Sequence, residues 1–198
     1  MTKKVRLGIA GVLLVATIGL VSMSGPSYAG GDKDLAETVK KIGATIGKGD
    51  ATGATKAATT AAKKIEETSD LMHLYRPRSK GGLGWGSKAG TNPATDGLEK
   101  KIEELKKAVP ATFFKDKANN EEAINWMGAL VELTLAKTPA KDMSGGKTKK
   151  AWIDYTEKLR SANTEFAKAV AGAKADDVKK AAAKINTACV DCHSKFKE

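Results

Sequence analysis

The chain has 198 residues and a mass of 20.8 kDa, which suits one domain with room for an appended segment. Its 34 Lys and Arg against 23 Asp and Glu give a formal net charge of +11. A hydrophobic share of 41% excludes a disordered chain, and an aromatic share of only 5% argues against a β-sandwich. Two cysteines exclude a disulfide-stapled miniprotein, and five prolines exclude a collagen-like fibre.

The first 29 residues have the pattern of a secretory signal peptide. Lys3, Lys4 and Arg6 precede an apolar run over residues 7–21, and the small residues of Ser27-Tyr28-Ala29 follow. The run is shorter than the ~20 residues of a membrane-spanning helix, so we favour cleavage over a retained anchor. We expect cleavage after residue 29, a domain over 30–198 in the periplasm or an equivalent exported compartment, and no membrane contact after cleavage.

Apolar side chains recur at spacings of three and four along the rest of the chain, which predicts helices. A first helix ends at Gly47-Lys48-Gly49, and Asp50 can cap the next, which we expect to run to about Tyr75. The stripe expected to face inward on this second helix is Ala54, Ala58, Ala61, Ile65, Thr68, Met72 and Tyr75.

Residues 76–96 contain five glycines and two prolines, which predicts a long loop, and long ordered loops tend to be functional. It could pack closely over a flat surface or be mobile and solvated. A short helix from about Leu98, a helix over roughly 119–137 and a final pair separated near Gly172 complete the chain. We therefore predict an all-α protein, an antiparallel four-helix bundle with one or two additional helices and a long Gly-rich loop.

The strongest motif is the CxxCH sequence at residues 189–193, which contains the only two cysteines of the chain. On a helix Cys189 and Cys192 share one face, so both thiols can form thioethers with the vinyl groups of one haem. His193 can then bind the haem iron. This motif is typical of covalent haem c attachment, and export of the chain suits it because that attachment occurs outside the cytoplasm.

Three other interpretations of the two cysteines stay open. A thioredoxin-like redox pair needs a βαβ context, which the sequence does not indicate. A zinc site needs a fourth ligand, and His73 is the only other histidine. A disulfide across one helical turn is compatible with an oxidising compartment. If haem is absent, we expect a helical structural or metal-binding protein.

From the last expected helix pair to the C-terminus, residues 147–198, the chain resembles the class II c-type cytochromes, the cytochrome c prime family. The resemblance implies a four-helix bundle, thioether links at Cys189 and Cys192, proximal iron ligation by His193, and dimers. The segment 76–96 and the additional helices depart from the family pattern. The family's distal residue has no counterpart here that a motif identifies.

Two neighbouring residues are candidates for the distal side of the iron, His73 and, as an alternative, Met72. If successive helices alternate in direction, the end of the second helix lies at the same end of the molecule as the CxxCH. Met72 could equally be a core residue, and His73 could simply complement a helix C-terminus. With neither as ligand, the iron is five-coordinate.

Arg76 and Arg78 could bind the haem propionates, since arginine pairs with carboxylates in a forked geometry, or be ordinary surface residues. The excess lysine suits an acidic redox partner, and export argues against nucleic acid. We therefore expect an electron carrier rather than an enzyme, with binding of NO or CO at an open iron as the alternative, and a homodimer is compatible with the family.

Overall fold

The computed structural model describes residues 31–197, so the predicted signal peptide lies outside it. These residues form seven α-helices and two short 3-10 helices and contain no β-strand, which confirms the all-α class. The elements are α1 Gly31–Gly47, α2 Ala51–Ala62, α3 Thr68–His73, η1 Arg78–Lys80, α4 Leu98–Leu105, η2 Ala111–Lys115, α5 Lys117–Ala136, α6 Lys149–Ala171 and α7 Ala175–Phe196.

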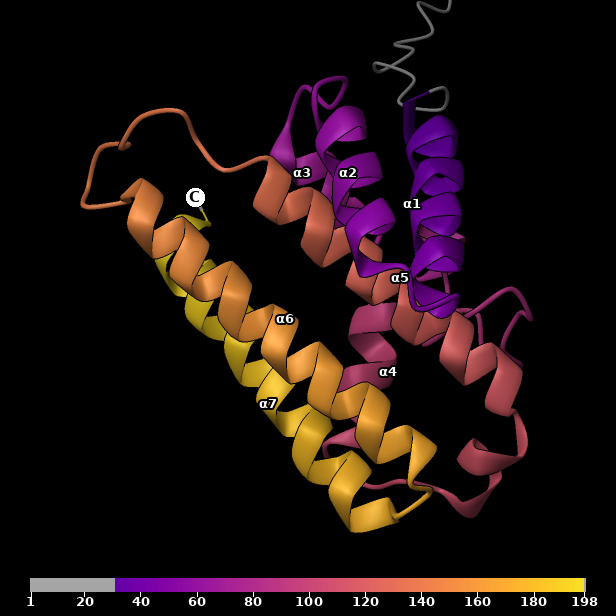
Figure 1. Cartoon of the computed structure of the whole chain (residues 1–198). Helices are drawn as coiled ribbons and strands as arrows, with labels where there is room; N and C mark the ends of the chain where they lie inside the picture. The colour runs from indigo at the N-terminus through magenta and orange to yellow at the C-terminus, as the bar shows by residue number, and fades with distance from the viewer. Residues whose placement is uncertain (1–30, 198) are drawn as a thin grey trace, which may run out of the picture.

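Helix α5 lies at the centre of the fold (Figure 1), with α1 and α2 packed on one side and α6 on another. It is buried around most of its circumference; its buried residues include Ala123, Ile124, Trp126, Met127, Ala129, Leu130, Val131, Leu133 and Thr134. So wide an apolar face places the helix in the interior, and only one side, which carries Glu121, Glu122 and Glu132, stays polar. Helices α6 and α7 form an antiparallel hairpin (Figure 1), and α4 packs on α7.

The local signals at helix ends act as expected. The Asp50 side chain caps α2 by accepting a hydrogen bond from the Gly53 N–H at 2.8 Å. Helix α6 ends at Gly172, and the following Ala173 takes a positive φ of 52°, which turns the chain into α7. Within residues 31–197 no helix has both the length and the hydrophobicity needed to cross a bilayer.

The prediction of one continuous helix from Asp50 to Tyr75 is wrong. The chain leaves the helix after α2 and resumes it in α3, with Glu67 extended between them. Lys137 in the α5 C-cap donates a hydrogen bond to the Ile65 carbonyl at 2.8 Å, so a side chain distant in sequence takes the place of a helical partner.

The break also changes which residues of the second half face inward. Leu71 and Leu74 are fully buried, whereas Met72 and Tyr75, expected on the inward stripe, are half-buried at the edge of the core. Because five residues between α2 and α3 are not α-helical, the 3.6-residue period restarts in α3 with a different phase. Met72 and Tyr75 therefore remain partly accessible.

The segment between α3 and α4 packs on the core. Leu83 and Trp85 are buried, and the Leu83 N–H donates to the Leu74 carbonyl at 3.0 Å. The Trp85 indole donates to the Asn120 side chain of α5 at 2.8 Å. In this segment it is therefore the protein core, through Leu83 and Trp85, that the backbone packs on.

Candidate functional site

The CxxCH sequence lies in the last two turns of α7, which continues as regular helix to Phe196. At about 100° per residue, Cys192 lies about 60° to one side of Cys189 and His193 about 40° to the other. The two thiols and the imidazole therefore project from one sector of the helix. Both cysteines are free thiols and half-buried, and Cys189 packs against the core.

The electrostatic environment keeps both thiols uncharged. Burial, followed by repulsion from Cys192 and from the Glu99 carboxylate, raises the pKa of the Cys189 thiol to about 12. Burial also raises the pKa of the Cys192 thiol. Thiol–disulfide exchange proceeds through a thiolate, and redox-active CxxC pairs hold one thiol at a low pKa. The environment therefore disfavours a thioredoxin-like redox pair.

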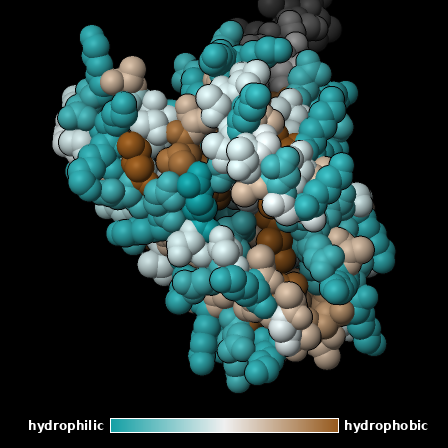
Figure 2. Space-filling view, viewed as in Figure 1, coloured by the Kyte–Doolittle hydropathy of each residue, from teal (hydrophilic) through white to brown (hydrophobic). Residues whose placement is uncertain are grey.

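His193 is exposed in the last turn of α7. Its carbonyl accepts a hydrogen bond from the Lys197 N–H at 2.9 Å, and the Ser194 hydroxyl donates to the Asp191 carbonyl at 2.7 Å. The imidazole is thus carried by ordered helical backbone beside the two thiols. Figure 2 shows apolar side chains at the surface of this end of the molecule, where the α6–α7 hairpin meets the C-terminal end of α5.

Tyr75, two residues after the end of α3, lies close enough to the two cysteines for their charges to act on its hydroxyl. Burial raises the pKa of its hydroxyl above the ordinary value, and the charges that ionised Cys189 and Cys192 would carry raise it further. Its carbonyl accepts a hydrogen bond from the Glu99 N–H at 3.0 Å, which joins the end of α3 to the start of α4. The sequence placed Tyr75 on a core stripe and missed it as a site residue; its position two residues after His73 was the available signal.

Met72 and His73 occupy the last turn of α3, just before Tyr75. Both are half-buried, and Met72 packs against the core. The His73 carbonyl accepts a hydrogen bond from the Arg76 N–H at 3.1 Å. The segment that carries both predicted distal candidates therefore leads into Tyr75, whose hydroxyl lies within electrostatic range of the two thiols.

The two predicted propionate-binding arginines differ in their surroundings. Arg78 Nε pairs with Asp96 Oδ2 at 3.0 Å, and Arg78 Nη2 donates to the Gly86 carbonyl at 2.7 Å. Gly84 permits this because its φ is +78° and a Cβ there would lie 2.2 Å from Arg78 Nη2. The Arg76 side chain is exposed. The Arg78 guanidinium therefore holds the α3–α4 segment together, and Arg76 is the one free to turn towards a ligand.

Asp96 is the main anchor of that segment, and the sequence did not single it out. Its side chain is 3% exposed and also accepts a hydrogen bond from the Trp85 N–H at 2.9 Å. Burial by itself would raise the Asp96 pKa, but the hydrogen bonds from Trp85, Arg78 and Gly90 outweigh it and hold the pKa below its ordinary value. An isolated Asp gives no such signal in a sequence, because its partner lies 18 residues away.

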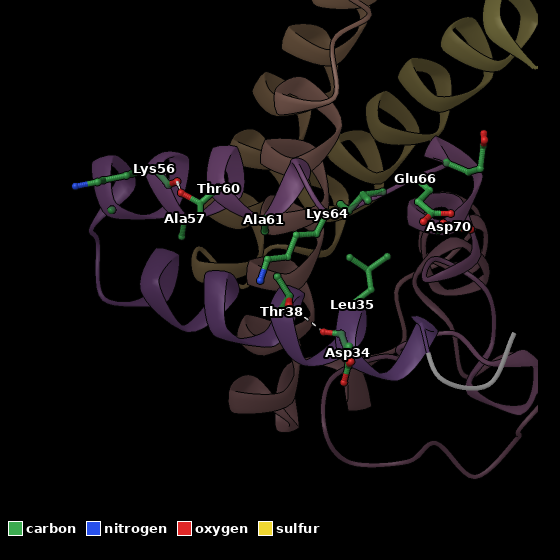
Figure 3. Close-up of a pocket in the computed structure, with 13 residues that line it drawn as sticks. Asp34, Leu35, Thr38, Lys56, Ala57, Thr60, Ala61, Lys64, Glu66 and Asp70 are labelled. Carbon is green, nitrogen blue, oxygen red and sulfur yellow. Dashed lines mark hydrogen bonds between the residues drawn. The ribbon is translucent and has the colours of Figure 1, made fainter.

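A groove with a volume of about 1030 Å³ lies between α1, α2 and the segment that leads from α2 into α3 (Figure 3). Leu35 and Ala61 contribute apolar surface, with Asp34 and Lys64 among its charged lining residues. None of its lining residues belongs to the CxxCH or to the predicted site. Among residues 31–197, no group of three or more His, Cys, Asp or Glu side chains is arranged to hold a metal ion.

Comparison with protein-family models, with curated proteins and with solved structures finds no match to this chain.

Proposed function

We propose that this chain is an exported monohaem c-type cytochrome that carries single electrons between redox partners. One observation carries the proposal: α7 presents two free thiols and the following imidazole from one sector of its last turns. The donor chemistry fits haem c, since two free cysteines three residues apart on one helix can each form a thioether, and an imidazole nitrogen is a common haem-iron ligand. Haem, when bound, supplies one-electron chemistry at its iron.

Each residue of the site has a separate role in this proposal. Cys189 and Cys192 hold the macrocycle, and His193 is the proximal ligand. Tyr75 would contribute an aromatic ring near the two thiols. Arg76 is the better candidate for a propionate partner, because Arg78 already pairs with Asp96.

The distal ligand is His73 or Met72, and the position of Tyr75 beside the cysteines supports both. Either residue would make the iron six-coordinate, which suits electron transfer. The second candidate function is binding of NO or CO at a five-coordinate iron. It applies if the half-buried Met72 and His73 side chains keep their present surroundings and neither turns to the metal.

We further propose that α1, α5, α6 and α7 form the four-helix bundle implied by the family resemblance, with α2, α3 and α4 as additional short helices. The packing of α1 on α5, α5 on α6 and α6 on α7 supports this arrangement. The segment between α3 and α4 is then the long Gly-rich loop, held on the bundle by Asp96 and by Trp85. A homodimer is compatible with this arrangement.

The proposed partner is an acidic redox protein in the periplasm or an equivalent compartment. The loop and helix ends around the CxxCH, residues 139–160 and 186–197, carry eight Lys and Arg against four Asp and Glu. Such an excess of positive charge accelerates encounter with an acidic surface, and salt screens it. Electron-transfer rates that do not fall with rising ionic strength would refute this choice of partner.

Two measurements test the proposal. The intact mass of the exported protein should exceed that of the polypeptide by one haem, and Cys189→Ala with Cys192→Ala should abolish the increase. A mass equal to the bare polypeptide refutes the proposal. Optical spectra of the reduced protein with and without CO then separate the two functions: a spectrum unmoved by CO indicates electron transfer, and His73→Ala or Met72→Ala should open the iron to CO.

A further inference from the structure

The end of α7 needs an anchor if His193 is to point in a fixed direction. The last turn of a helix lacks part of its hydrogen bonding and frays readily. In α7 the Lys197 N–H to His193 carbonyl bond closes this turn. Backbone bonding by itself would leave the imidazole on a weakly held helix end.

An aromatic cluster supplies that anchor. The Phe196 ring packs edge-to-face on Trp152, with centroids 5.1 Å apart and planes at 78°, and on Tyr155 at 6.1 Å and 83°. Trp152 and Tyr155 both belong to α6, and the Trp152 indole donates to the Thr134 carbonyl of α5 at 3.0 Å. The aromatic clasp, as we call Trp152, Tyr155 and Phe196, ties the last turn of α7 to two other helices.

We propose that Phe196 is the positioning residue for His193. Phe196 lies one turn after His193, and its direction around the helix falls between those of Cys192 and His193. Fixing the Phe196 ring between Trp152 and Tyr155 therefore fixes the rotation of the turn that carries the imidazole. The inference rests on the proposed function, because the direction of the imidazole matters to the haem only if His193 binds its iron.

Phe196 lies at the edge of the fold, so its packing can position the last turn of α7 without forming part of the hydrophobic core. Phe196 is half-buried, whereas Phe166 in the middle of α6 is fully buried in the core. Removal of the Phe196 ring takes away contacts at one end of α7 and leaves the core residues Ile185 and Ala188 in place. The change should therefore be felt in the last turn of α7 and at the site rather than throughout the fold.

The test compares Phe196→Ala with Phe114→Ala in the full exported protein. Phe114 is a matched control because it is also half-buried and has an edge-to-face partner, Phe113, at 5.4 Å and 76°, but it precedes α5 rather than lying on α7. The first readout is hydrogen exchange of the Lys197 amide, and the second is the ferric optical spectrum. Phe196→Ala should speed the exchange about tenfold, as expected for loss of two aromatic contacts.

The same variant should change the proportion of high-spin to low-spin iron while the thioether-linked mass stays unchanged. Phe196→Tyr, which keeps the ring, should restore both readouts, and Phe114→Ala should alter neither. Phe196→Leu keeps most of the apolar volume without the ring, and serves in place of Phe196→Ala if that protein does not accumulate.

The outcomes decide the inference separately from the proposed function. Wild-type exchange in Phe196→Ala overturns the inference, because the clasp would then not hold the turn. Faster exchange with an unchanged spectrum also overturns it, because the imidazole would not depend on the turn. A wild-type protein without the mass of haem refutes the proposed function and the role at the iron together, and the exchange data still decide whether Phe196 anchors α7.

Discussion

Of the polar side chains in this protein, the buried carboxylate of Asp96 is the one whose replacement we expect to reduce the free energy of unfolding most. Its replacement by alanine removes the acceptor of the hydrogen bonds from the Trp85 N–H and the Arg78 guanidinium. The Trp85 residue is 5% exposed, so solvent cannot easily replace its lost partner. The Arg78 side chain is 36% exposed and keeps its bond to the Gly86 carbonyl, so water compensates part of that loss.

The expected destabilisation comes mainly from these two contacts, because the third donor, the Gly90 N–H, belongs to an exposed residue that water can solvate. A buried N–H left without a partner costs about 1–3 kcal/mol. The interaction with a partly exposed guanidinium contributes about 1 kcal/mol once solvent screening is taken into account. Asp96→Ala should therefore lower the free energy of unfolding by about 2–4 kcal/mol, which for a domain of this size lowers Tm by about 4–16 °C. Asp96→Asn keeps an acceptor for Trp85 and should lose about half as much.

Urea denaturation followed by circular dichroism measures these differences directly. Asp154→Ala is the control, because Asp154 pairs with Lys150 at 2.6 Å where both side chains are exposed, 51% and 83%. Exposed pairs of this kind contribute less than about 1 kcal/mol. If Asp96→Ala is no more destabilising than Asp154→Ala, Asp96 does not hold the α3–α4 segment on the core.

Three further predictions concern the same contacts and the break after α2. The pKa of Asp96 in the folded state lies below its ordinary 3.8, so the ionised carboxylate stabilises the fold. The difference in unfolding free energy between wild type and Asp96→Asn, measured in denaturation series from pH 7 to 3, should be constant above about pH 5 and shrink as the pH falls below 3.8. A difference that grows on acidification contradicts this. Gly84→Ala should destabilise the protein more than Gly49→Ala. Both glycines have a positive φ, which costs an alanine about 1–2 kcal/mol, but only at Gly84 would the added Cβ also clash with the guanidinium paired with Asp96. Equal losses of stability in thermal melts would exclude that clash. Lys137→Met should cost about 1 kcal/mol in urea denaturation by leaving the Ile65 carbonyl without its donor, and an unchanged midpoint would show that water replaces it.

Local features of the chain were predictable from the sequence wherever their cause lies within a few residues. The helical class follows from the three-and-four spacing, and the Asp50 cap follows from a side chain acting on the N–H of a residue three positions on. The turn at Gly172 and the common face of Cys189 and Cys192 follow from helix geometry. These features were read correctly because the interactions that produce them are short-range.

Features with long-range causes were missed. The chain breaks between α2 and α3 where the local pattern continued as helix, and there the Ile65 carbonyl pairs with a lysine 72 positions away. That break buries Leu71 and Leu74 and leaves Met72 at the edge of the core. Tyr75 reaches the two cysteines only because α3, α4 and α7 come together in space. The sequence by itself determined which residues we propose to carry the chemistry of the site, and the tertiary structure decided which side chains surround them, because burial is a property of the whole chain.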